Sequence, residues 1–94
     1  MEFLVQYEMD GDGINEIVTK VLPATKVIEL YGYSDYNGVS NLQVFDIREM
    51  GKFEKLRIKH SHNEVVDDYG HLDIYCDIIS PLGEVLATAS YEDH

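Results

Sequence analysis

Residues 71–91 read HLDIYCDIISPLGEVLATASY, and this stretch decides the fold. Apolar and polar residues alternate along its first part, which is typical of a strand with one buried face. The segment Ser80–Gly83 then places a serine, a proline and a glycine where a type I turn prefers them. A second strand-like run follows the turn. The stretch therefore predicts an antiparallel hairpin formed by strands 71–79 and 84–91.

Similar runs, separated by turn residues, recur along most of the chain. Asn37-Gly38 stands between two of them and is a strong hairpin signal. The acidic segment 63–70 is expected to be the longest loop. Because strands that are consecutive in sequence usually pair, we predict an α+β fold with a mostly antiparallel sheet of five or six strands. The predicted strands cover residues 2–9, 25–33, 39–47, 53–61, 71–79 and 84–91.

The segment 13–22 has two interpretations. Its apolar residues recur at spacings of three and four, which indicates one face of a helix. Asp12 is a candidate N-cap of that helix, and Pro23 would end it. The abundance of Ile, Val and Thr after an Asp-Gly turn instead favours a hairpin strand. We expect one short helix at about 13–22, packed on the sheet within a single compact acidic domain, 1–94.

Charge is distributed unevenly along the 94 residues, whose formal net charge is -11. Eight acidic residues and no Lys or Arg lie from His60 to His94, whereas five of the seven basic residues lie between Arg48 and Lys59. A field of one sign favours a cationic partner and repels nucleic acid and anionic membranes. Hydrophobic residues make up 45% of the chain, so this acidity belongs to a folded protein rather than to a disordered tail.

The residue types also bear on the compartment. Cys76 is the only cysteine, so no internal disulfide demands an oxidising environment. The N-terminus has neither the basic start nor the apolar run of a signal peptide. No apolar stretch approaches the roughly 18 to 20 residues that span a bilayer. We therefore expect a soluble, cytoplasmic protein, located in the host cytosol if a phage encodes it.

Two short segments contain potential metal ligands. Residues 8–16 resemble the calcium loop of the FG-GAP repeats of integrin-type propellers, where oxygen ligands alternate around a sharp glycine turn. The alternative is a plain glycine-rich turn. His60 and His62 share one face of a predicted strand, with Glu64, Asp67 or His71 as a possible third ligand. This pair is similar to the first cupin motif, although the acid follows too soon. We favour solvated histidines and expect no metal and no cofactor.

Catalytic motifs are absent from the sequence. Phosphate-binding glycine loops and nucleophile elbows do not occur, and a small sheet with one helix offers little room for a catalytic cleft. Cys76 falls on the apolar face of its predicted strand, where burial leaves a thiol inert. A basic strip on strand 53–61 has no interleaved aromatic residues, and it is expected to neutralise a neighbouring acidic strand rather than to bind nucleic acid. We do not expect an enzyme.

The remaining signal is an acidic surface rich in tyrosine. Solubility alone needs only about 2 to 8 net charges in a small domain, and this chain has more. Tyrosine is enriched in protein interfaces because it supplies rigid contact area with a polar tip. The alternative is that the tyrosines are ordinary sheet residues and the acids maintain solubility. We expect a partner-binding face formed by Asp67, Asp68, Asp73, Tyr75, Asp77 and Glu84.

In size and acidity the chain is similar to phage-encoded DNA mimics, such as anti-CRISPR proteins, antirestriction proteins and uracil-DNA glycosylase inhibitors. The resemblance implies a non-catalytic inhibitor that fills the basic nucleic-acid-binding groove of a host defence or DNA-processing protein. An alternative is an immunity or adaptor protein that binds a cognate basic toxin outside its nucleic-acid site. Both predict a basic protein partner, no direct contact with nucleic acid or membrane, and a monomer or weak dimer.

Overall fold

The computed structural model describes residues 1–11, 13–48 and 54–93. Six strands form one antiparallel sheet in the order β2-β1-β3-β4-β5-β6, and two short helices follow β2 in the chain. This confirms the predicted α+β class. Neither helix in the described ranges is long and apolar enough to cross a membrane. The elements are β1 (Glu2–Asp10), β2 (Asn15–Pro23), α1 (Ala24–Gly32), α2 (Ser34–Asn37), β3 (Val39–Asp46), β4 (Glu54–Val65), β5 (Leu72–Ile79) and β6 (Val85–Asp93).

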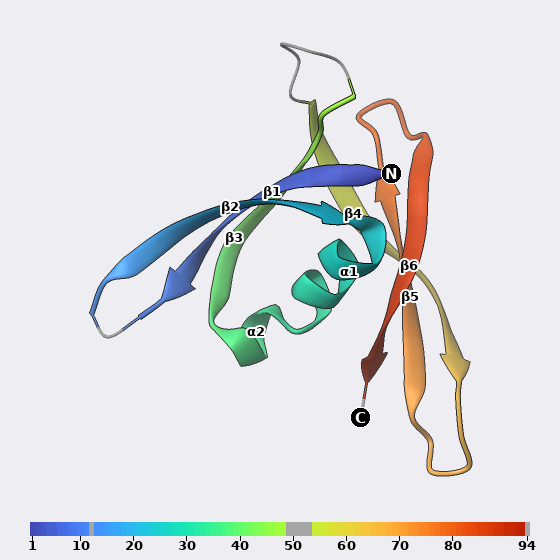
Figure 1. Ribbon diagram of the computed structural model, residues 1–94. Helices are drawn as coiled ribbons and strands as arrows, with labels where there is room; N and C mark the ends of the chain where they lie inside the picture. Colours follow the sequence, from blue (N-terminus) through green and yellow to red (C-terminus); the bar gives the residue numbers. More distant parts are fainter. Residues whose placement is uncertain (12, 49–53, 94) are drawn as a thin grey trace.

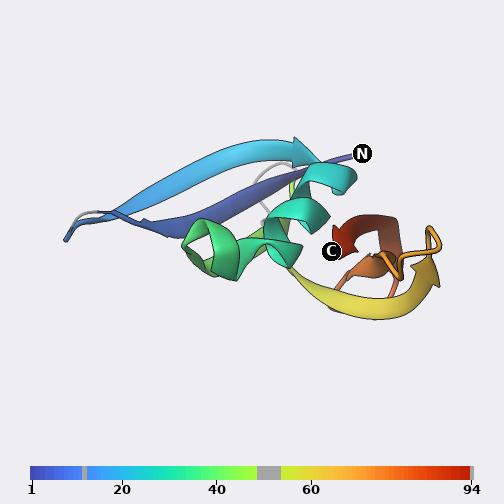
Figure 2. The ribbon, with the colours of Figure 1, turned by 90° about the horizontal axis from the view of Figure 1, so that it is seen from below.

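The sheet curves around α1, with β1, β2 and β3 on one side of the helix and β5 and β6 on the other (Figure 1). The same arrangement is visible from below (Figure 2). β4 connects the two sides, because its first residues pair with β3 and its later residues pair with β5. We call the sheet face toward α1 the inner face and the opposite one the outer face.

The core lies between α1 and the inner face. Phe3 and Val5 of β1, Val27 and Ile28 of α1, and Ile78 of β5 are fully buried there. The two strands contribute alternate residues because successive side chains of a strand point to opposite faces. Full burial of a side chain of this size stabilises the fold by about 1.5–3 kcal/mol. This cluster therefore holds the two sides of the curved sheet together.

The helix lies one segment later than predicted. Asn15–Pro23 is strand β2, paired with β1 along its whole length, and residues 25–33, predicted as a strand, form most of α1 instead. The hairpin alternative is therefore correct for residues 15–23, whose β-branched side chains favour an extended backbone. Pro23 precedes α1, where its missing N–H is harmless because the first N–H groups of a helix have no intrahelical partner. Asp12, the predicted N-cap, lies outside the described residues.

The two predicted hairpin turns have opposite outcomes. Asn37-Gly38 does not join two strands: Asn37 ends α2, and Gly38 follows it with a φ of 69°, in the left-handed conformation of many helix ends. Both structures need a residue that tolerates positive φ, so the dipeptide alone does not distinguish them. The turn Ser80–Gly83 is confirmed. The Gly83 N–H donates to the Ser80 carbonyl at 2.9 Å, and the turn joins β5 to β6.

Strand boundaries also differ from expectation at the acidic loop. β4 continues to Val65, so the first part of the predicted loop 63–70 is strand. The predicted start of this strand, residue 53, lies outside the described residues. The extra length brings Glu64 into the sheet, opposite Asp73 of β5. This difference changes the composition of the outer face.

α1 packs closely against β6. A Cβ added to Gly32 would lie 2.3 Å from the nearest ring atom of Tyr91, so only glycine permits this approach. The Tyr33 ring meets the Tyr91 ring edge-on, with 5.6 Å between centroids, and its hydroxyl donates to the carbonyl of Glu92. The helix thereby fixes one edge strand of the sheet.

Candidate partner-binding face

The outer face of β5 carries three of the predicted partner-binding residues. Asp73, Tyr75 and Asp77 lie on this face, while Cys76 and Ile78 are buried on the inner face. The predicted alternation of β5 is therefore confirmed. β5 lies between β4 and β6, so each of the three residues has a neighbour on both sides.

Asp73 lies at the centre of a row of carboxylates. It is directly opposite Glu64 on β4 and directly opposite Glu92 on β6. Directly opposite residues share a face and neighbouring strands lie about 4.8 Å apart, so the three residues cross the sheet within about 10 Å. The Asp73 side chain makes no hydrogen bond or ion pair with any described residue. We call Glu64, Asp73 and Glu92 the acidic row.

An aromatic pair borders the acidic row. A register shift between His60 and His62 brings His62 opposite Tyr75, and the two rings stack with 4.4 Å between centroids and 6° between planes. The Nε2 atom of His62 lies 3.4 Å from the Oε1 atom of Glu64. The outer face therefore combines carboxylates with a flat, half-exposed ring surface.

The other end of the face has a mixed charge. Lys59 lies directly opposite Asp77, so the basic and acidic strands are neighbours at this pair, as predicted. On the other side, the Thr88 hydroxyl donates to the Oδ1 atom of Asp77 at 2.7 Å. Arg57 of β4 lies opposite Ile79, near the same end. Asp77 therefore has a neighbouring cation and a hydrogen-bond donor, whereas Asp73 has acidic neighbours.

The remaining predicted residues lie in the turns at the two ends of β5. Glu84 is exposed in the turn to β6, beyond the mixed end, and Asp68 is exposed beside the acidic end. The eight residues of β5 separate these two turns by about 26 Å. The six predicted residues thus form a line along β5 rather than one compact cluster.

Asp67 shapes the turn between β4 and β5. Its Oδ1 atom accepts hydrogen bonds from the backbone N–H groups of Tyr69 and His71, at 2.9 and 3.2 Å, and its Oδ2 atom lies 2.5 Å from His71 Nδ1. Although desolvation raises the pKa of Asp67, the two backbone donors and the His71 ring outweigh it and lower the pKa below 3.8. The Asp67 carboxylate therefore stabilises the turn between β4 and β5.

Neither suspected metal motif assembles a metal site within the described ranges, where no three His, Cys, Asp or Glu side chains lie close enough to hold an ion. His60 turns to Asn63, with 2.5 Å between Nε2 and Oδ1. The calcium-like segment is the turn between β1 and β2, in which the Gly11 N–H donates to the Ile14 carbonyl. Its Asp12 lies outside the described residues.

Cys76 is buried, with 1% of its surface exposed. Desolvation, followed by the nearby Asp77 charge, raises the pKa of its thiol. A thiol that holds its proton is a poor nucleophile, as the sequence predicts.

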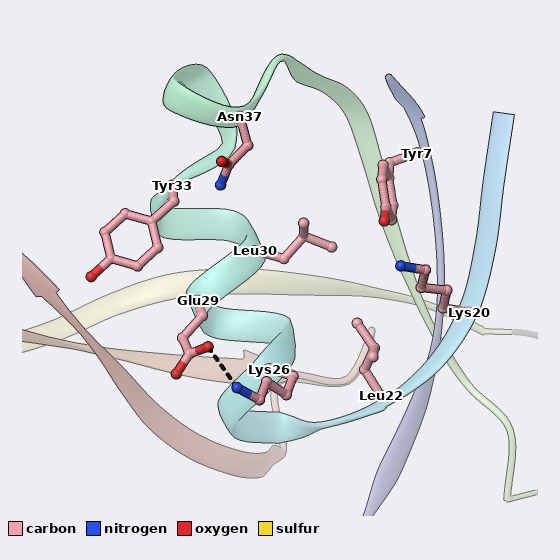
Figure 3. A pocket seen from close by; sticks show the side chains of 8 residues that line it. All are labelled: Tyr7, Lys20, Leu22, Lys26, Glu29, Leu30, Tyr33 and Asn37. Atoms are coloured by element: carbon pink, nitrogen blue, oxygen red, sulfur yellow. Dashed lines mark hydrogen bonds and ion pairs between the residues drawn. The ribbon is translucent and has the colours of Figure 1, made fainter. Parts of the chain in front are cut away.

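A pocket of about 260 Å³ lies between α1 and the inner face of β1 and β2 (Figure 3). Lys20 extends into it from β2 toward Tyr7, and Lys26 Nζ lies 3.2 Å from Glu29 Oε2. The protein therefore has more open volume beside the helix than we expected. The sole carboxylate among the lining residues is bound by a lysine, so the pocket offers no carboxylate pair for acid–base chemistry. The lining residues are Tyr7, Lys20, Leu22, Lys26, Glu29, Leu30, Tyr33 and Asn37.

Comparison with known proteins finds no relative. No protein-family model matches the chain, and neither the curated proteins nor the solved structures contain a match.

Proposed function

We propose that this protein is a non-catalytic inhibitor that occupies the nucleic-acid-binding groove of a basic partner. The acidic row takes the place of DNA phosphates in this complex. The observation that carries the proposal is the position of Asp73, which lies directly between Glu64 and Glu92 on an open sheet face.

This arrangement does not help the fold. Like charges directly opposite each other in a sheet are destabilising, whereas opposite charges at such positions stabilise by about 0.2–1 kcal/mol. At Asp77 the neighbouring strand provides Lys59, but at Asp73 both neighbours are acidic. A cationic groove would relieve the repulsion around Asp73. The row therefore supports a role in binding more than a role in stability.

The dimensions of the face are similar to those of DNA. The acidic row spans about 10 Å across the strands, and Asp77 lies about 13 Å further along β5. The major groove is about 12 Å wide, with phosphates along both of its rims. Between the two acidic positions, the stacked rings of Tyr75 and His62 supply contact area for an apolar notch in the partner. The protein would thus present the acidic row on one side of an aromatic centre and the mixed end, which contains Asp77, on the other.

The exchange of one carboxylate for an amide at two positions tests this assignment. Asp73→Asn and Asp77→Asn make the same chemical change on the same strand and face, four residues apart, and leave the same net charge. We expect Asp73→Asn to weaken binding to a partner captured from the native host by about tenfold, equivalent to about 1.4 kcal/mol. Asp77→Asn should have a smaller effect, because Lys59 already offsets that charge. Calorimetry with the purified partner measures both.

Salt provides the second arm of the experiment. A phosphate mimic is attracted by the charges that bind DNA, so affinity should fall steeply between about 50 and 200 mM salt. Equal effects of Asp73→Asn and Asp77→Asn, or an affinity that does not respond to salt, would show that the acidic row is not the contact surface. A partner that keeps its full DNA affinity in the complex would instead indicate the immunity or adaptor function.

A further inference from the structure

β2 is an edge strand with open hydrogen-bonding groups. It pairs only with β1 among the described strands, so one row of its backbone N–H and C=O groups has no strand beside it. Its nine residues extend over about 30 Å. Natural edge strands are commonly shortened, interrupted by bulges or covered, because such a row is a template for another chain. The pairing of β1 with β2 shows no bulge, and Pro23 stands only at the end of β2.

The outer face of β2 is apolar and exposed. Ile17 is 66% exposed and Val21 is 49% exposed, and Thr19 lies between them on the same face. Ile14, just before the strand, is 76% exposed. A pairing strand would cover part of this aliphatic surface, at about 25 cal/mol for each Å² removed from water.

The charges of β2 complement those of a second β2. The strand carries one acid, Glu16, and one base, Lys20, which lie on the same inner face four residues apart. When two copies pair antiparallel about a two-fold axis through Val18, Glu16 of each copy lies directly opposite Lys20 of the other. The same register places Ile17 diagonally across from Val21 of the other copy, within reach for side-chain contact.

From this complementarity we infer that β2 is a self-association edge, through which two copies of this chain form a twelve-stranded antiparallel sheet. Such a pair is isologous, so the same surface serves both copies and the assembly closes as a dimer. The chain has a net charge of -11, but β2 carries no net charge, so two copies do not repel each other strongly when they meet at this edge. The acidic row of each copy lies on β4, β5 and β6, at the opposite end of the sheet from β2. Dimerisation through β2 therefore leaves both rows accessible and gives the dimer two binding faces for a basic partner.

Charge reversal tests the register. Glu16→Lys and Lys20→Glu should each weaken the dimer by about tenfold, because each places two like-charged pairs across the axis. An equimolar mixture of the two variants should form a heterodimer, since one copy then presents only lysines and the other only glutamates. The double variant Glu16→Lys/Lys20→Glu should self-associate like the wild type. Sedimentation equilibrium at about 0.15 M salt measures each case.

Matched controls separate this register from an effect of net charge. Glu84→Lys and Lys55→Glu make the same two charge changes at exposed positions away from β2, and they should leave the dimer unchanged. Thermal melts show whether each variant folds. A wild-type protein that stays monomeric at the highest concentration would overturn the inference. So would single variants that dimerise normally, or a mixture of them that forms no heterodimer.

Discussion

The two edge strands, β2 and β6, have the same length and very different surroundings. β6 receives α1 on its inner face, where Gly32 lets the helix approach Tyr91 and the Tyr33 hydroxyl binds the backbone. β2 leads directly into α1, yet most of its residues are exposed. One edge is thus fixed by the helix and contributes to the acidic row, while the other stays open. An edge position alone therefore does not determine the role of a strand. That role depends on whether another element packs against the strand and on which charges the strand carries.

The largest expected effect comes from the fixed edge. Gly32→Ala places a methyl group within about 2.4 Å of the Tyr91 ring, so the helix or the ring must move. We expect a loss of about 2–3 kcal/mol in the free energy of unfolding, measured by urea denaturation. Thr25→Ala, at an exposed position of the same helix, is the matched control and should not destabilise. If Gly32→Ala were as stable as the wild type, the close contact with β6 would be absent.

The next effect is expected at Asp46, at the end of β3. Its carboxylate accepts hydrogen bonds from the side chain and the backbone N–H of Arg48, with 2.7 Å between Oδ2 and the nearest guanidinium nitrogen. These bonds lower the pKa of Asp46, although desolvation opposes them. Arg48 is half-exposed, so the pair is partly screened by solvent. We expect Asp46→Asn to cost about 1 kcal/mol at neutral pH, within the range for hydrogen bonds to charged groups after that discount.

The pH dependence of this effect follows from the direction of the shift. A carboxyl group whose pKa is lowered in the folded state contributes its full stabilisation above its unfolded pKa, near 3.8. The contribution decreases as the pH falls toward the folded pKa and is absent below it. The stability difference between Asp46→Asn and the wild type should therefore persist at pH 7 and decrease as the pH falls below about 3.8. A difference that grew on acidification would contradict the assignment.

A similar effect is expected at Tyr33. Tyr33→Phe removes the hydroxyl that binds the Glu92 carbonyl and keeps the ring that packs on Tyr91. The loss should be about 1 kcal/mol, the net value of a typical intramolecular hydrogen bond. Tyr36→Phe makes the same change at a side chain that is 92% exposed, and its melting temperature should equal that of the wild type. Equal melting temperatures for both variants would mean that the hydroxyl does not help to fix β6.

The smallest effect has the opposite sign. Asp73→Asn removes the central charge of the acidic row and should stabilise the fold by about 0.5 kcal/mol. Asp77→Asn should give no such gain, because it weakens the favourable pair with Lys59 and alters the bond from Thr88. Parallel denaturation curves of the two variants at low salt distinguish these outcomes. A destabilised Asp73→Asn would show that the row serves the fold.

The fold was predictable from the sequence wherever all local signals in a segment favoured the same structure. The alternation of β5 and the turn Ser80–Gly83 agree with each other, and both are confirmed. Segment 13–22 fits a helix by spacing and a strand by β-branched content, and pairing with β1 decides between them. Pro23 can follow one helix or precede another, so the proline alone does not locate the helix.

The acidic row was not predictable, because it depends on register between strands far apart in the sequence. The alternating pattern of β5 predicts that Asp73 lies on the partner-binding face. The sequence predicts a loop at Glu64, and only the register of β4 with β5 reveals Glu64 as a neighbour of Asp73. The register shift that stacks His62 on Tyr75 likewise leaves no local signal. The sequence shows which strands carry acidic residues. Only the pairing of the strands in the sheet shows that the acidic residues cluster on one side of Tyr75.

Fluorescence anisotropy tests directly whether this protein and DNA compete for one groove of the partner. A labelled DNA duplex is first bound to the purified partner, and the protein is then added. We expect the anisotropy to fall to the value of free duplex, and Asp73→Asn to require about tenfold more protein than the wild type. An anisotropy that stays high or rises, with the protein bound beside the DNA in a ternary complex, would contradict phosphate mimicry.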